Sequence, residues 1–366
     1  MVLRAAGEIG CAHCAKSGAD RDCPSCARLV CETCSASWAT CPEPTGREVR
    51  LGLTARVRDI DPSGRLALVS HWRQPLRAFD LRQLCWVPDV VLPRHLFNWS
   101  RANPPRLTST GMFVHANLGS DARDYYFRGL TWRSLDGTRT TDIEVPPPWQ
   151  SMQVSAVGDR VFYVGPNDQV TVLHASESLA VETRTLGVHA TAKPVRSAFL
   201  DEDRALLVTG TRGAVVMHRL GVQLEMLWRH ATEDGGPVTS VALAGKALVA
   251  SVQRSTGALA FEVRWLDDSL TPGPLAHRIV PDSPVRATAI SRDGRYFAIG
   301  TDDGLTVHDL DARSAVNFDD HTDAITCVRF ASDDLLIAAD SDNRVILRPR
   351  TPAGYAGPQL RVEVKK

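Results

Sequence analysis

The chain has 366 residues, of which 42 are basic and 42 acidic, so its formal net charge is zero. Proteins that bind along a nucleic-acid backbone usually carry an excess of Lys and Arg, so this balance argues against nucleic acid as the main partner. No stretch approaches the roughly 20 apolar residues of a membrane span, and the N-terminus lacks the apolar core of a signal peptide. We therefore expect a cytoplasmic protein without a membrane partner.

Cysteines are concentrated near the start of the chain. Seven of the nine lie between residues 11 and 41, as Cys11, Cys14, Cys23, Cys26, Cys31, Cys34 and Cys41. In a reducing compartment such a cluster favours metal binding over disulfides. Two cysteines separated by two residues form a knuckle whose thiolates can bind one tetrahedral zinc ion. Residues 1–44 hold too few apolar side chains to fold without metal, so we expect a finger that binds one or two Zn²⁺.

The segment CPSCARLVCETC, residues 23–34, is similar to a B-box-like, cross-braced zinc finger, and the resemblance covers about residues 8–43. It implies a first zinc site built from Cys11, Cys14, Cys31 and Cys34. It also implies that Cys23, Cys26 and Cys41 supply three ligands of a second site. B-boxes usually end in two histidines, which this chain lacks after Cys41. Either the second site is empty, or its fourth ligand is Glu43, His13 or His71.

A repeated pattern begins at about residue 48. Residues 57–81 can be laid on residues 285–310, since both contain a strand, an Asp/Ser-Gly-Arg turn, an aliphatic strand, a polar corner and a third strand. Further copies begin at residues 152, 195, 238 and 325, so that successive starts from 152 are 43, 43, 47 and 40 residues apart. This is the period of four-stranded propeller blades. The 95 residues between the starts at 57 and 152 leave room for one diverged copy, which makes seven.

The expected strands follow from apolar runs bounded by Asp, Ser, Asn and Gly. In the last copy they are residues 325–330, 335–340 and 344–350, and in the diverged copy 112–118, 125–135 and 140–145. Fourth strands are expected at 83–87, 181–186, 224–229 and 275–280. Two segments could close the ring, 49–53 and 359–364, and we expect 49–53 to pair into the last blade because that removes an open sheet edge. The predicted fold is all-β, a seven-bladed propeller over residues 48–366 after a Cys-rich module.

The repeat resembles the WD-repeat family most clearly in its last two copies. His321, the strand from residue 325 and Ser341-Asp342 look like the family's His…Ser-Asp sequence, and VHDL at 307–310 stands at its aromatic-Asp dipeptide. The resemblance implies that His321 and Asp342 belong to a hydrogen-bond network that ties the strands of a blade together, a structural role rather than a catalytic one. Other copies lack the His or the Trp, so a related propeller outside the family stays open.

The sequence contains no recognisable nucleotide-binding, hydrolase, metalloprotease or calcium-loop motif. Its most irregular segment, residues 88–105, contains residue types that are enriched at binding hot spots, namely Arg94, His95, Phe97, Trp99 and Arg101. A loop of this length in a compact fold is usually functional or disordered. We therefore expect it to contact a partner, although its aromatic residues could instead fill the core of the diverged copy.

These features favour a non-enzymatic scaffold whose propeller and zinc finger dock partner proteins in a multiprotein assembly. Proteins of this kind resemble components of bacterial systems that pair an AAA+ ATPase with adhesion-type domains, an analogy at the level of the fold. One alternative is a small-molecule sensor or enzyme that uses the central channel, which requires convergent polar groups and a perturbed titratable side chain there. Another is a nucleic-acid or ubiquitin-type reader that uses the finger.

Overall fold

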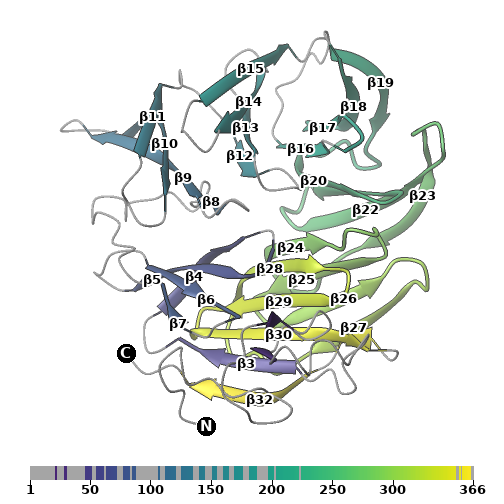
Figure 1. The fold of residues 1–366 in the computed structure, drawn as a ribbon. Helices are drawn as coiled ribbons and strands as arrows, with labels where there is room; N and C mark the ends of the chain where they lie inside the picture. The colour runs from purple at the N-terminus through teal and green to yellow at the C-terminus, as the bar shows by residue number, and fades with distance from the viewer. Residues whose placement is uncertain are drawn as a thin grey trace.

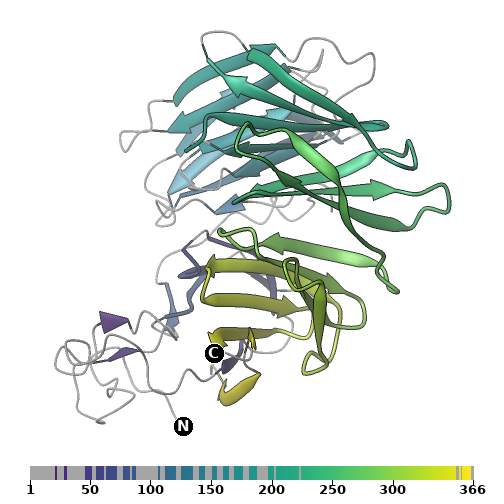
Figure 2. The same cartoon turned by 90° about the vertical axis from the view of Figure 1, so that its right-hand side faces the viewer.

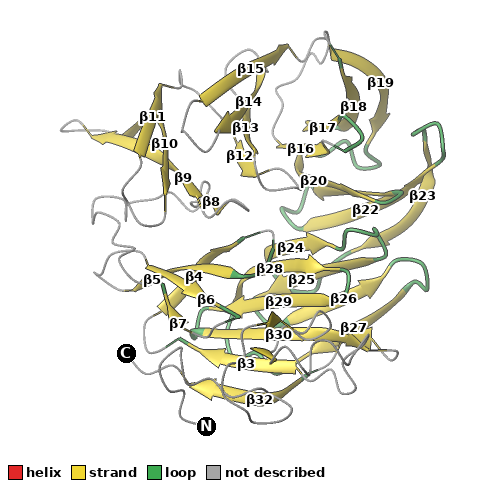
Figure 3. Ribbon diagram, in the orientation of Figure 1, coloured by secondary structure: helices red, strands yellow, loops and turns green. Residues whose placement is uncertain are grey.

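The computed structural model describes residues 21–22, 29–30, 46–87 with short gaps, 106–107, strand segments between 112 and 187, and 197–363 with brief interruptions. The seven clustered cysteines and the segment 88–105, with Arg94, His95, Phe97, Trp99 and Arg101, lie outside the described residues. Within the described ranges every regular element is a strand (Figure 3), and no helix there is long and apolar enough to cross a membrane.

The strands form consecutive antiparallel sheets in chain order (Figure 1). The first sheet contains β4 (Ala55–Ile60), β5 (Leu66–His71), β6 (Arg77–Asp80) and β7 (Cys85–Trp86). The second contains β8 (Arg106–Leu107), β9 (Met112–Ser120), β10 (Tyr125–Ser134) and β11 (Thr140–Glu144). The third contains β12 (Ser151–Val154), β13 (Arg160–Val164), β14 (Gln169–Ala175) and β15 (Val181–Gly187). The second sheet is the expected diverged copy.

The remaining four sheets follow in the same order. The fourth contains β16 (Ser197–Asp201), β17 (Leu206–Thr211), β18 (Ala214–Leu220) and β19 (Leu224–Ala231). The fifth contains β20 (Val238–Ala244), β21 (Ala247–Gln253), β22 (Leu259–Leu266) and β23 (Pro272–Ile279), and the sixth contains β24 (Val285–Ile290), β25 (Tyr296–Thr301), β26 (Leu305–Asp309) and β27 (Ser314–Phe318). The last sheet begins with β28 (Ile325–Ser332), β29 (Leu335–Asp340) and β30 (Arg344–Thr351). The described strands thus make seven sheets of four or more strands.

The first strands of these sheets contact one another in a cycle (Figures 1 and 2). β4 contacts β8, and the contacts continue through β12, β16, β20 and β24 to β28, which contacts β4. The first strands therefore surround a common axis, and the last strands lie at the rim. Burial agrees with this order, since all six residues of β17 and of β25 are buried, whereas β27 is largely exposed.

The hydrophobic core lies between neighbouring sheets rather than within one. One cluster joins Val69 and Phe79 of the first sheet to Ile337 and Leu347 of the last. Another joins the fifth and sixth sheets, where the rings of Phe261 and Phe297 meet edge to face with centroids 5.1 Å apart. A sheet that buries both faces needs a neighbour on each side, so the closed arrangement satisfies each sheet in turn.

Two distant segments complete the last sheet. β3 (Gly46–Arg50) pairs antiparallel with β30, and β32 (Pro358–Glu363) pairs in parallel with the other edge of β3. The short β31 (Gly354–Tyr355) pairs separately with β30. The expected closure by the N-terminal segment is confirmed, with a strand that starts three residues earlier than the predicted 49–53. The second candidate segment joins the same sheet beyond it. Val49 is fully buried in the core between the first and last sheets.

Within the Cys-rich segment, two short strands are described. β1 (Arg21–Asp22) pairs antiparallel with β2 (Leu29–Val30), with Arg21 opposite Val30. In the sequence these strands flank the second cysteine pair, Cys23 and Cys26, which itself lies outside the described residues.

Candidate functional site

The buried corner of the last sheet contains His321. Its Nδ1 lies 3.1 Å from Oδ2 of Asp340, and both side chains are completely buried. Asp342, which the sequence assigned to this network, lies instead at the turn, with 54% of its side chain exposed. It accepts a hydrogen bond from Oγ1 of Thr322 at 3.1 Å. His321 is thus paired with Asp340 and not with Asp342.

Asp340 connects three parts of the sheet. Besides facing His321 from the end of β29, its Oδ1 accepts the backbone N–H groups of Asp342 and Arg344, each at 3.0 Å. These bonds hold the turn into β30, where Asn343 adopts a left-handed conformation with φ of 62°. Because the pair is sealed from solvent and Asp340 also holds the turn into β30, its arrangement supports a structural role.

Basic residues occupy the third-strand position that corresponds to the WD family's aromatic residue. In four successive sheets this position holds His218, Arg264, His308 and Arg348, each paired across to the second residue of the preceding strand. Burial lowers the pKa of His218 and of His308 to about 4. Arg348 is fully buried, forms an ion pair with Asp320, and its guanidinium carbon lies 4.1 Å from the centroid of the Phe318 ring.

Asp59 ties three sheets together at the axis. This buried side chain on β4 accepts the backbone N–H of Leu107 on β8 at 2.8 Å through Oδ2. Its Oδ1 lies 3.4 Å from Nη2 of Arg329 on β28. One carboxylate thus links the first, second and last sheets.

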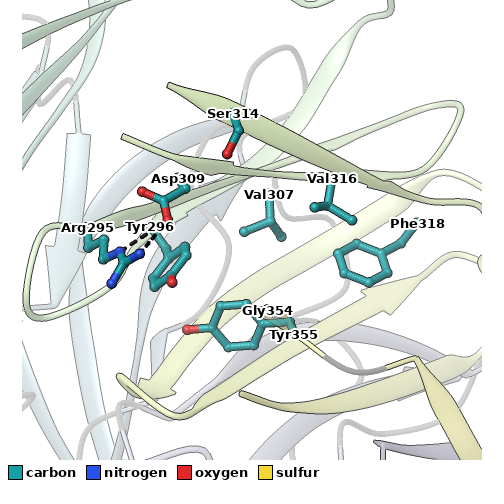
Figure 4. A pocket seen from close by; sticks show the side chains of 9 residues that line it. All are labelled: Arg295, Tyr296, Val307, Asp309, Ser314, Val316, Phe318, Gly354 and Tyr355. Atoms are coloured by element: carbon teal, nitrogen blue, oxygen red, sulfur yellow. Dashed lines mark hydrogen bonds and ion pairs between the residues drawn. The ribbon is translucent and has the colours of Figure 1, made fainter. Parts of the chain in front are cut away.

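A pocket of about 160 Å³ lies at the rim, between the sixth sheet and β31 (Figure 4). We call it the rim pocket, and it is lined by Arg295, Tyr296, Val307, Asp309, Ser314, Val316, Phe318, Gly354 and Tyr355. Two tyrosines form its aromatic wall, with ring centroids 5.3 Å apart and nearly perpendicular planes. The side chains of Ser314, Val316 and Phe318 come from alternate positions of β27, the outermost strand of the sixth sheet.

The charges around the rim pocket are paired. Arg295 donates to Oδ2 of Asp309 from both Nε and Nη2, at 3.1 and 2.8 Å. Burial acts to raise the pKa of Asp309, but these bonds and backbone N–H donors outweigh it and lower the pKa. The guanidinium of Arg350 lies 4.8 Å from the centroid of the Tyr296 ring. Tyr355 donates to the backbone oxygen of Asp333 at 2.7 Å, and burial raises its pKa.

The rim pocket has the chemistry of a binding surface, with aromatic and aliphatic walls and a neutralised ion pair at one end. Among the described residues, no group of three or more His, Cys, Asp or Glu side chains is placed to hold a metal ion. Neither the rim pocket nor β27 is predicted from the sequence. The available signal was the uncharged run of residues 314–318 between Arg313 and Asp319.

Comparisons with known proteins agree with this architecture. The family model described as "WD domain, G-beta repeat" matches residues 313–347, which cover β27, β28, β29 and the first half of β30. The chain is similar in structure to the β-propeller domain of Cps50 (Swd1) from Myceliophteria thermophila, with a TM-score of 0.60 and 14% identity. That match covers 84% of this chain and all of the other. No curated protein matches by sequence. The fold is thus an all-β propeller that contains a WD repeat.

Proposed function

We propose that this protein is a non-enzymatic, cytoplasmic scaffold whose propeller and N-terminal zinc finger dock partner proteins in a multiprotein assembly. The observation that carries the proposal is the use of its buried polar groups. His321 with Asp340, and Asp59 with Arg329 and Leu107, hold strands and sheets together. Because these polar groups hold the propeller together, the outer surface is left to bind other molecules. Propeller surfaces commonly bind proteins.

We further infer that the seven sheets are the seven blades of one ring and that Cys11–Cys41 bind one or two zinc ions. Antiparallel pairing of β1 with β2 around the second cysteine pair supports a compact finger. The finger is followed directly by β3, which is built into the last sheet, so we place it beside the seam where the ring closes.

The test is affinity capture of the intact chain from its native organism, followed by reconstitution with the purified partner. We expect a stable protein partner, and by fold-level analogy an ATPase among the captured proteins. Trp99→Ala together with Arg101→Ala should weaken the reconstituted complex if the segment 88–105 contacts the partner. Cys31→Ser should weaken it if the finger does. Failure to recover any stable partner with the finger intact would count decisively against a scaffold.

A second candidate, binding of an anionic small molecule in the central channel, is favoured by two arginines. Arg56 and Arg58 are exposed on β4, the strand of the first sheet that borders the axis. The Nε of Arg58 donates to Ser70 Oγ at 2.7 Å. Calorimetric titration with inorganic phosphate tests this candidate, and equal heats from wild type and Arg58→Gln would eliminate it.

A further inference from the structure

The outer strand of the sixth sheet is an open edge. Among the described strands, β27 pairs only with β26, and its burial pattern is exposed at Ser314 through Asn317 and intermediate at Phe318. Val316, at its centre, is 51% exposed. An exposed apolar strand with unpaired backbone groups is a template for another strand.

β27 also lacks the usual protection of an edge strand. Native edges commonly carry charged residues or proline, which discourage pairing with another chain. Every other outer strand of four or more residues among the described sheets carries at least one charged residue, namely β11, β15, β19, β23 and β32. The sequence of β27, SAVNF, contains neither a charged residue nor a proline.

Charge is placed instead at the two ends of β27. Arg313 immediately precedes the strand and Asp319 immediately follows it, and both are exposed. In antiparallel self-pairing about Val316, position 313 of one chain lies opposite position 319 of the other, since both are three residues from the centre. Arg313 of each copy then faces Asp319 of its partner, and Val316 faces Val316. The strand is therefore complementary in charge to a second copy of itself.

We propose that two copies of this chain form a two-fold symmetric dimer by antiparallel pairing of β27 with β27. The interface is isologous, because each copy contributes the same strand and the same two charges. Opposed β-branched residues are favourable cross-strand pairs, which suits Val316. The side chains of Ser314, Val316 and Phe318 share the face that lines the rim pocket, so the incoming strand covers its apolar side.

The molecule already extends a sheet in this way within itself. β3 and β32 extend the last sheet beyond β30. In the sequence, β3 lies near the N-terminal end of the chain and β32 follows β30. Strand addition to an outer edge is thus compatible with the geometry of these sheets. In the sixth sheet the corresponding place beyond β27 is open among the described strands.

Sedimentation velocity of the full chain over a range of concentrations tests the proposal. We expect a reversible dimer for the wild type and a monomer for Val316→Lys, because the substitution sets two like charges opposite each other. Met226→Lys is the matched control, since Met226 is 49% exposed on the outer strand β19. It should sediment as the wild type does. A monomeric wild type, or a dimer that persists in Val316→Lys, would overturn the proposal.

Charge reversal tests the register independently of the apolar contact. Arg313→Asp and Asp319→Arg should each weaken the dimer by roughly two- to thirtyfold. An exposed ion pair contributes little free energy, but the two-fold symmetry means that each substitution removes two such pairs. The double variant Arg313→Asp/Asp319→Arg should restore most of the affinity. Circular dichroism and the unfolding temperature verify that the variants are folded. Single and double variants that weaken the dimer to the same extent would contradict antiparallel pairing about Val316.

Discussion

At the scale of single residues, His321, Asp340 and Asp59 are buried connectors between strands and sheets. His321 could be predicted as one, because its position before a strand and a Ser-Asp pair matches the WD pattern. Its partner could not be predicted, because Asp340 and Asp342 lie only two residues apart. Which of them is buried depends on the residue at which β29 ends. The register shows that Asp340 is the last residue of a buried strand, while Asp342 is in the turn.

Removing one member of the buried pair should be costly. In His321→Ala the Asp340 carboxylate stays buried without its partner, and we expect the free energy of unfolding to fall by about 3 kcal/mol. Asp342→Ala removes an exposed hydrogen bond from Thr322 and a 3.9 Å ion pair with Arg344, so the loss of unfolding free energy should be less than about 1 kcal/mol. Urea unfolding of both variants measures the difference. Equal losses would mean that Asp342 shares the structural role.

The buried histidine of the fourth sheet makes stability depend on pH. Burial lowers the pKa of His218 from 6.5 to about 4. Above pH 6.5 the ring is neutral in both states, so His218 adds no pH dependence there. As the pH falls from 6.5 to about 4, the unfolded chain takes up a proton that the folded chain excludes, and stability declines.

His218→Leu should remove this contribution. The full decline attributable to the ring is about 3 kcal/mol, since one pKa unit corresponds to about 1.36 kcal/mol. Unfolding free energies measured between pH 7.5 and 4 should therefore decrease less steeply for the variant than for the wild type. Identical slopes would show that His218 does not titrate differently in the two states.

At the scale of elements, most strands follow from the sequence because each is a short apolar run between turn-forming residues. The strands at 335–340 and 140–144 agree closely with expectation, whereas β23 begins three residues early, at two prolines that read as a loop. The rim pocket could not be predicted. It depends on Tyr355 of β31 meeting Tyr296 of the sixth sheet, a contact that no local pattern encodes.

β3 should be essential to the last sheet. Val49 is fully buried on this strand, so Val49→Asp places a charge without a partner in the core between the first and last sheets. We expect a loss of about 3–5 kcal/mol in unfolding free energy. Val280→Asp is the control, because Val280 is 46% exposed, and it should change stability by only about 0.5 kcal/mol. A mild effect at Val49 would argue against closure by β3.

At the scale of the whole molecule, the repeat period predicted the architecture better than any single motif did. Copies spaced 40–47 residues apart correspond to successive sheets, because each unit buries its two faces only against neighbours. The WD match covers residues 313–347, which include His321. The partner contact predicted at residues 88–105 stays a prediction, because this segment lies outside the described residues.

Metal content tests the N-terminal module. Purified protein should contain one or two zinc ions per chain by inductively coupled plasma mass spectrometry, and Cys31→Ser should lower that number by removing a ligand of the first site. Two ions would require a fourth ligand for the second site from Glu43, His13 or His71. Cys327→Ser, at a buried cysteine of β28, is the control and should retain the wild-type metal content. Metal-free protein would rule out the zinc finger.

The way the last sheet is assembled sets an order for folding during synthesis. β3 is made early, yet both strands that flank it, β30 and β32, come from residues 344–363. Until the ribosome has released those residues, β3 has no partner and the first and last sheets cannot share their core. The intermediate sheets can form one after another in the meantime, since each needs only its neighbours. Such late, long-range pairing slows folding and leaves apolar edges exposed, so the nascent chain is a natural client for chaperones.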